Sequence, residues 1–280
     1  MPYTTLISAS ELVALGGHAV IVDCRFDLAD TSWGERKYTA SHIPGAVYAH
    51  LDRDLSGTKT GSNGRHPLPV PGHVRAAFGR LGIGPGVQVV AYDQDTGMYA
   101  ARLWWLLRWM GHTSVAVLDG GFAKWQAEGL PTTSGVQSNT RQAFEGEPND
   151  AMLVDAADVD RIRSDAAWRL VDARAPERFR GEVEPLDPVA GHIPGAVNHF
   201  FRQNLDDAAT FRSPSELRER IGSAVAGVAE DHIVCYCGSG VTAAHNLLAL
   251  ERAGIHGARL YNGSWSEWSS DHGREIATGA

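Results

Sequence analysis

An internal repeat constrains the fold of this chain more than any other feature. IVDCR at Ile21–Arg25 returns as LVDAR at Leu170–Arg174, and SHIPGAV at Ser41–Val47 returns as GHIPGAV at Gly191–Val197. Two later blocks are matched in the same order, VVAYD with IVCYC and VLDGGFAKW with LYNGSWSEW. Matched blocks in one order predict a single fold used twice.

The repeat also predicts the domain organisation. With 280 residues, the chain is long enough for two domains of ordinary size. The segment between the copies, TTSGVQSNTRQAFEGEPND, is polar, short of large aliphatic side chains and rich in turn residues, which is typical of a linker. We therefore expect an N-terminal domain over 1–133, a linker over 134–150 and a C-terminal domain over 151–280.

Each copy has the sequence pattern of an α/β domain. Short β-branched runs such as AVIVD and HIVCYC alternate with stretches of helical period such as ARLWWLLRWMG and AAHNLLALERAG. Continuous apolar strands between amphipathic helices predict a mostly parallel sheet with helices on both faces. The reactive groups of such sheets lie in the loops beyond the carboxyl ends of the strands.

The composition narrows the partners and the compartment. The formal net charge is -8 and the sequence pI is about 5.8, so the chain lacks the basic footprint that nucleic acid or an anionic membrane needs. Its sequence has neither a signal-type N-terminus nor an apolar run of membrane-spanning length. The three cysteines do not form a disulfide framework. We expect a soluble monomer in the reducing cytoplasm.

Cys237 stands where a parallel sheet places its reactive groups, directly after the predicted strand HIVCY and directly before a predicted helix. The following Gly238, Ser239 and Gly240 are small enough for the backbone to turn several N–H groups toward the sulfur, and the helix N-terminus adds its dipole. Such a loop stabilises a thiolate and, after reaction, a persulfide. The Gly-Ser-Gly turn favours this function over the alternative, a small buried core thiol.

The rest of the repeat supports this choice of nucleophile. Cys24 and Cys235 lie within predicted strands, so we interpret both as core thiols. The position that matches Cys237 in the first copy is Asp93, and a carboxylate cannot act as a sulfur nucleophile. The first copy is therefore predicted to keep the fold without the chemistry.

These motifs resemble those of the two-domain rhodanese superfamily of sulfurtransferases, from about Leu6 to about Trp268. HIPGA occurs twice and the cysteine loop once, as in the tandem of an inactive N-terminal and an active C-terminal domain. Thiosulfate sulfurtransferases of this superfamily have a cationic C-R-K-G-V-T loop, and 3-mercaptopyruvate sulfurtransferases have C-G-S-G-V-T. The loop here is CGSGVT at 237–242. The resemblance implies sulfur transfer from 3-mercaptopyruvate, with thiosulfate:cyanide sulfur transfer as the alternative.

The resemblance also implies roles for single residues. In the mercaptopyruvate enzymes a loop serine is grouped with a histidine and an aspartate of the other domain; Ser239, His66 and Asp54 match them, with Asp52 adjacent to Asp54 in the pattern. Cys237 would attack the donor sulfur while Ser239 and His66 polarise the substrate carbonyl or relay a proton to it. The substrate-binding residues implied by the motif are Arg178, Gly238, Gly240, Val241 and Thr242.

One departure from the family pattern concerns the substrate carboxylate. Arginines bind it in the family, since a guanidinium matches a carboxylate bidentately. Arg178 fits the first arginine, but Leu186 and Asp187 stand where the second is expected. We expect Arg65 or Arg53 to compensate.

Other classes of protein fit the sequence less well. A phosphatase or arsenate reductase of the C-x5-R type needs an arginine where this chain has Ala243. A non-enzymatic binding module is disfavoured by the intact second loop. No metal-ligand spacing or nucleotide fingerprint is found, so no cofactor is expected. The expected partners are a small sulfur donor, a thiol or cyanide acceptor and a thioredoxin-like reductant.

Overall fold

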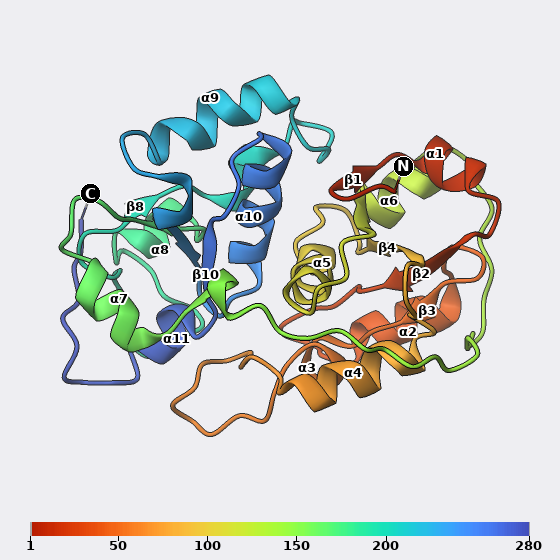
Figure 1. Ribbon diagram of the computed structural model, residues 1–280, viewed down its shortest axis with the longest axis horizontal. Coiled ribbons are helices and arrows are strands. Elements are labelled where there is room, and N and C mark those ends of the chain that lie inside the picture. Colours follow the sequence, from red (N-terminus) through yellow and green to blue (C-terminus); the bar gives the residue numbers. More distant parts are fainter. Residues whose placement is uncertain (1, 280) are drawn as a thin grey trace. The chain divides into compact units, whose positions relative to one another are not determined.

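The computed structural model describes residues 2–279, which form two compact units (Figure 1). The first unit contains the residues up to Gly57, Pro69–Asn149 and Asp207–Thr210. The second contains Thr58–Leu68, Asp150–Asp206 and the chain from Phe211 on. The segment Thr58–Leu68 thus belongs to the second unit, although it lies in the first half of the sequence. The domain bounds 1–133, 134–150 and 151–280 stay a prediction.

The first unit is built on a five-stranded sheet in the order β1-β5-β4-β2-β3, with every neighbouring pair parallel. The central strands are apolar and buried, as expected for a parallel sheet covered on both faces. The strands are β1 (Leu6–Ile7), β2 (Ala19–Asp23), β3 (Val47–Tyr48), β4 (Gln88–Tyr92) and β5 (Val115–Leu118). The helices are α1 (Ala9–Ala14), α2 (Trp33–Ala40), α3 (Leu51–Asp54), α4 (Pro71–Arg80), α5 (Ala100–Trp109) and α6 (Gly121–Ala127).

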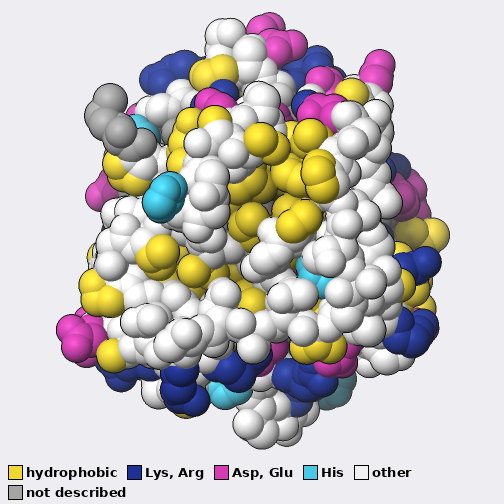
Figure 2. Space-filling view, turned by 90° about the vertical axis from the view of Figure 1, so that its right-hand side faces the viewer, with side chains coloured by type: hydrophobic (Ala, Val, Ile, Leu, Met, Phe, Trp, Pro, Cys, Tyr) yellow, Lys and Arg dark blue, Asp and Glu magenta, His cyan; other side chains and the backbone are white. Residues whose placement is uncertain are grey.

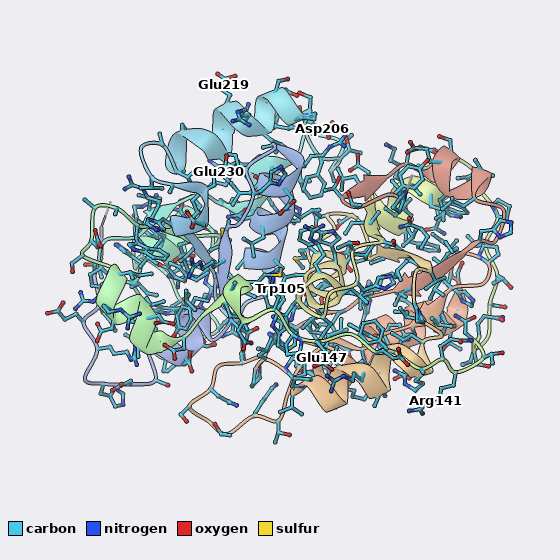
Figure 3. The ribbon with its side chains drawn as sticks, in the orientation of Figure 1. Trp105, Arg141, Glu147, Asp206, Glu219 and Glu230 are labelled. Atoms are coloured by element: carbon cyan, nitrogen blue, oxygen red, sulfur yellow. The ribbon has the colours of Figure 1, made fainter. Side chains whose placement is uncertain are left out.

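Alternation along the strands assigns helices to both faces of this sheet. Val90 and Tyr92 of β4 pack in one cluster with Leu12 of α1 and Trp125 of α6. The intervening residues point to the opposite face, where α5 packs against β4 and β5. On α5, Trp105 (labelled in Figure 3) and Trp109 are both buried and stack with ring centroids 5.9 Å apart.

The second unit repeats the same sheet, in the order β6-β10-β9-β7-β8 and again all parallel. Its strands are β6 (Leu153–Val154), β7 (Arg169–Asp172), β8 (Val197–Asn198), β9 (Ile233–Tyr236) and β10 (Arg259–Tyr261). Its helices are α7 (Ala156–Ile162), α8 (Pro176–Phe179), α9 (Pro214–Ala224), α10 (Thr242–Arg252) and α11 (Ser264–Trp268), with 3-10 turns η1 (Asp150–Met152), η2 (Phe201–Asn204) and η3 (Glu230–His232). The predicted tandem α/β fold, with a parallel sheet flanked by helices in each copy, is confirmed.

Helices cover both faces of the second sheet as well. Val234 of β9 packs in one cluster with Ile162 of α7 and Trp265 of α11. On the opposite face α10 packs against β9 and β10, and α9 lies beside α10 (Figure 1). Glu219 projects from α9 toward the solvent (Figure 3).

The repeated motifs are explained by one buried ion pair in each unit. Arg25 binds Asp23 through two nitrogens and donates to the Ser41 carbonyl at 2.6 Å. Arg174 binds Asp172 in the same way and donates to the Gly191 carbonyl at 2.7 Å. Each arginine therefore joins the end of a strand to the residue before HIPGA. The sequences D-x-R and HIPGA recur together because the same contact fixes both.

The described residues contain no helix that is both long and apolar enough to cross a membrane. On the face drawn in Figure 2, Lys and Arg side chains are interspersed with Asp and Glu, and hydrophobic side chains gather near its middle.

Candidate active site

Cys237 follows β9 directly and is 2% exposed. The Ser239 N–H donates to its Sγ at 3.4 Å. The backbone of Cys237 is fixed on both sides, because its N–H donates to Ser264 Oγ at 3.1 Å and its carbonyl accepts the Trp265 N–H at 2.9 Å. The thiol is thus held at the carboxyl end of a central strand, where the sequence predicted it.

The shape of this loop requires a glycine at position 240, and a second glycine, Gly238, leaves room for an arginine side chain. Gly240 has φ +76°, and a Cβ there would lie 2.6 Å from the Asn262 carbonyl oxygen. At Gly238 a Cβ would lie 2.7 Å from Arg65 Nη2. Val241 is buried at the N-cap of α10, and Thr242 is the first residue of that helix. The CGSGVT sequence therefore turns the chain tightly from β9 into α10.

His66 and Ser239 are brought together in the second unit. His66 Nδ1 lies 2.7 Å from Ser239 Oγ, and the two residues are 3% and 5% exposed. The contact joins positions far apart in sequence. It places the Ser239 hydroxyl, held by the His66 imidazole, two residues after Cys237 in the same loop. Such a pair can donate a proton to, or orient a hydrogen bond on, a carbonyl oxygen.

The segment that carries His66 is held by the turn between β10 and α11. Asn262 Nδ2 donates to the His66 carbonyl at 3.3 Å. The Arg65 N–H donates to Ser266 Oγ at 2.9 Å. These bonds explain why Thr58–Leu68 packs with the second unit. Sequence reasoning missed Asn262, Ser264 and Ser266 as supports of the site; the signal was the repeated block LYNGSWSEW, which contains all three.

Two arginines lie over Gly238. A Cβ at Gly238 would be 3.6 Å from Arg178 Nη2, in addition to its contact with Arg65. Arg178 donates to Glu184 at 2.5 Å and to Asp187 at 3.3 Å, and Arg65 also donates to Asp187. Of the two arginines expected to compensate for the missing one, Arg65 therefore lies at the loop. Arg53, in the first unit, pairs with Glu35 at 3.0 Å.

The hydrogen-bond partners of Asp54 in the structure are Arg80 and His50, whereas the family resemblance groups it with His66 and Ser239. Its carboxylate accepts from Arg80 Nη2 at 2.6 Å and from the His50 N–H at 2.8 Å, all within the first unit. A role of Asp54 beside His66 stays a prediction.

The other two cysteines have the environment of core thiols. Cys24 and Cys235 are 1% and 0% exposed. Burial raises the pKa of the Cys24 thiol, with a further contribution from Asp23, and burial likewise raises the pKa of the Cys235 thiol. Both thiols are therefore held in the unreactive neutral form.

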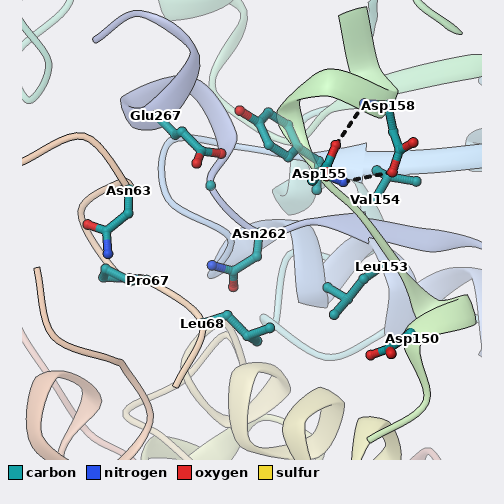
Figure 4. Close-up of a pocket in the computed structure, with 12 residues that line it drawn as sticks. Asn63, Pro67, Leu68, Asp150, Leu153, Val154, Asp155, Asp158, Asn262 and Glu267 are labelled. Carbon is teal, nitrogen blue, oxygen red and sulfur yellow. Dashed lines mark hydrogen bonds between the residues drawn. The ribbon is translucent and has the colours of Figure 1, made fainter. Parts of the chain in front are cut away.

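Asn262, which holds the His66 carbonyl, also lines a cavity of about 450 Å³. Figure 4 shows Asn262 between Pro67 and Leu68 on one side and Leu153 on the other. The lining also includes Asp155 and Asp158, which bond each other's N–H groups at the start of α7. Among the residues from 2 to 279, no group of three or more His, Cys, Asp or Glu is arranged to hold a metal ion.

The comparison with known families matches both halves of the chain to the rhodanese-like domain, over residues 8–128 and 155–271. The chain belongs to the rhodanese family. The two matched ranges agree with the repeat and with the two identical sheet orders.

Full-length relatives narrow the family. A Pseudomonas aeruginosa protein named "Probable 3-mercaptopyruvate sulfurtransferase" is 47% identical over 283 residues, covering 100% of both chains. A Mycobacterium tuberculosis protein named "Putative thiosulfate sulfurtransferase SseB" is 38% identical, covering 98% of this chain and 97% of its own. The crystal structure of SseA from Escherichia coli, one of the 3-mercaptopyruvate sulfotransferases, superimposes with a TM-score of 0.82 at 31% identity, covering 95% of this chain and 100% of its own. The predicted family and the predicted enzyme class, sulfurtransferase, are confirmed.

Proposed function

We propose that this rhodanese-family chain moves sulfane sulfur from 3-mercaptopyruvate to a thiophilic acceptor through a persulfide on Cys237. The observation that carries this proposal is the 2.7 Å contact between His66 Nδ1 and Ser239 Oγ inside the CGSGVT loop. A donor with a carbonyl group gains from a positioned hydroxyl, whereas thiosulfate has no carbonyl to protonate.

The proposed first half-reaction begins with the Cys237 thiolate. Its sulfur attacks the donor sulfur, the carbon–sulfur bond of 3-mercaptopyruvate breaks, and the electron pair moves into the pyruvate enolate. The enolate takes a proton and leaves as pyruvate. In the second half-reaction an acceptor thiolate or cyanide attacks the outer sulfur of the persulfide, which regenerates the Cys237 thiolate.

Ser239 and His66 are proposed to stabilise the enolate oxygen. When His66 Nδ1 is protonated, its N–H donates a hydrogen bond to Ser239 Oγ. The serine O–H then points away from the ring and is available to donate to the substrate carbonyl. The burial of both residues strengthens this hydrogen bond, since little water competes for it.

The donor carboxylate is proposed to bind at Arg178 and Arg65, with Gly238, Gly240, Val241 and Thr242 forming the loop around the sulfur. Both guanidinium groups lie within reach of a group placed over Gly238. They provide planar N–H donors for a carboxylate. Asp54 is proposed as the orienting acid of the group, as the resemblance implies.

Thiosulfate:cyanide sulfur transfer is the second candidate. The observation that favours it is the same arginine pair, because the loop lacks basic side chains and Arg65 and Arg178 supply positive charge there instead. In that reaction Cys237 would take the outer sulfur of thiosulfate, the sulfur–sulfur bond would break, and sulfite would leave.

The test is steady-state sulfur transfer to cyanide with 3-mercaptopyruvate and thiosulfate as rival donors. Intact mass after donor alone should show the gain of one sulfur on the wild type and on Cys235→Ala, but none on Cys237→Ala. A higher kcat/KM for 3-mercaptopyruvate supports the proposal, and a higher kcat/KM for thiosulfate supports the second candidate. No sulfur transfer from either donor would overturn both.

The acceptor and the compartment belong to the same proposal. Three free cysteines without a disulfide are consistent with a reducing compartment, and we place the chain in the cytoplasm. A small thiol or a thioredoxin-like reductant is the proposed acceptor there, and the chain is proposed to act as a monomer.

A further inference from the structure

A chain of alternating charges leads from the end of β7 to the Cys237 loop. Each of its members contacts the next: Asp172, Arg174, Glu184, Arg178, Asp187 and Arg65. The nitrogen–oxygen distances from Arg174 to Asp172 and to Glu184 are 2.7 and 3.2 Å. With three carboxylates and three guanidinium groups, the chain of charges is neutral.

The inner part of this chain is structural. Arg174 also holds the Gly191 carbonyl, as described for the repeated ion pair. Glu184 binds both Arg174 and Arg178 and accepts the N–H groups of Leu186 and Asp187. Its carboxylate therefore shapes the segment that carries Asp187.

The outer part faces the reacting loop. The Asp187 side chain is 4% exposed, and its two carboxylate oxygens bind different arginines. Oδ1 contacts the guanidinium group of Arg65, and Oδ2 contacts that of Arg178. The side chains of Arg65 and Arg178 are 23% and 15% exposed, and both guanidinium groups lie over Gly238. Asp187 thus already binds the two arginines that an anionic donor would use.

We propose that Asp187 is a specificity-determining residue that disfavours dianionic donors at this site. Its carboxylate cancels one of the two positive charges of the arginine pair. A donor with one carboxylate therefore loses little, whereas a donor with two negative charges lacks the second cation it needs. This inference rests on the proposed sulfur transfer and names the residue that sets its choice of donor.

The key experiment removes the charge of Asp187 and keeps its shape. Because the attraction scales with donor charge, Asp187→Asn should raise kcat/KM about threefold for 3-mercaptopyruvate and about tenfold for thiosulfate at low ionic strength. Asp187→Glu should restore the wild-type ratio of the two values. Glu182→Gln is the matched control: it removes one negative charge from the same segment, where the Glu182 side chain is 55% exposed and pairs with Arg180. An unchanged donor ratio in Asp187→Asn, or the same change in Glu182→Gln, would overturn the proposal.

A second readout separates this inference from the proposed function. The Cys237 thiolate displaces iodide from iodoacetate, an anion, and from iodoacetamide, which is neutral and of similar size. Asp187→Asn should raise the ratio of the two alkylation rates at Cys237 about threefold, with peptide mass assigning the modified cysteine. A general loosening of the fold would raise both rates together. If neither donor supports turnover, the proposed function fails, but the ratio of the two alkylation rates still tests the electrostatic role of Asp187. An equal ratio in Asp187→Asn and wild type contradicts that role.

Discussion

At the scale of single residues, Asp93 and Cys237 occupy the same place in the two units with opposite outcomes. The Asp93 carboxylate accepts four backbone N–H groups, from Asp95, Gly97, Tyr99 and Ala100. The first unit therefore has an anion-binding loop and fills it with its own side chain. The sequence predicted the loss of chemistry there, and the contacts give its physical form.

Asp93 makes the stability of the first unit depend on pH. Burial raises the pKa of Asp93 to about 6, against the opposing hydrogen bonds of Gly97, Tyr99 and Ala100. A raised folded-state pKa stabilises the protein most below the unfolded value of 3.8, and this contribution is lost as the pH rises through about 6. The free energy of unfolding of the wild type, relative to Asp93→Asn, should therefore fall by roughly 2 kcal/mol between pH 4 and pH 7.

Chemical denaturation of both proteins across that pH range measures the effect. Asp95→Asn is a suitable control, because it changes a partly buried carboxylate of the same loop. A constant difference between wild type and Asp93→Asn from pH 4 to pH 7 contradicts the raised pKa.

Ser239 is expected to matter for one donor more than for the other. Ser239→Ala removes the hydroxyl that His66 holds at 2.7 Å, and with it the proton donor proposed for the enolate oxygen. The kcat with 3-mercaptopyruvate should fall about 100-fold, within the usual range for positioned acid–base groups. The kcat with thiosulfate should fall less than fivefold, because no enolate oxygen forms when sulfite leaves. Equal losses with both donors would assign Ser239 to loop structure instead.

At the scale of elements, the turn from β9 to α10 depends on backbone that only glycine adopts comfortably. In Gly240→Ala the new residue must adopt a positive φ, and its Cβ clashes with the Asn262 carbonyl oxygen. Gly227→Ala, at φ +85° with open space around it, meets the positive φ alone. The Gly240 variant should lose at least about 2 kcal/mol more of the unfolding free energy than the Gly227 variant, and most of its activity. Thermal or urea unfolding with activity assays measures both; equal losses would mean that the contact with Asn262 relaxes without cost.

The sequence predicted these elements well where the information is local. Strands such as β4 and β9, the repeat and the position of Cys237 follow from apolar runs and turn residues. The position of Thr58–Leu68 could not be predicted this way, because it depends on bonds from Asn262 and Ser266, about 200 residues later. The family pattern marks Asp187 as a departure, but its pairing with Arg65 and Arg178 depends on the fold and cannot be predicted from local sequence.

At the scale of the whole molecule, each copy of the repeat has a hydrophobic cluster of its own. Val90 of β4 belongs to the cluster of the first unit, and Val234 of β9, its match in the repeat, belongs to the cluster of the second. Both valines are 0% exposed. Equivalent substitutions at these two positions therefore probe one core each.

We expect the two cores to respond separately to heat. Val90→Ala and Val234→Ala should each cost about 2 kcal/mol, since each removes two buried methyl groups and leaves a cavity. Calorimetry should resolve two transitions, with each variant lowering only one of them by about 5 to 10 °C. Because the proposed nucleophile, Cys237, follows the strand of Val234, thermal loss of activity should move with the Val234→Ala transition and not with that of Val90→Ala. A single transition that both variants lower equally would mean that the two units unfold as one cooperative body, and the inactive copy would then stabilise the active one as a whole.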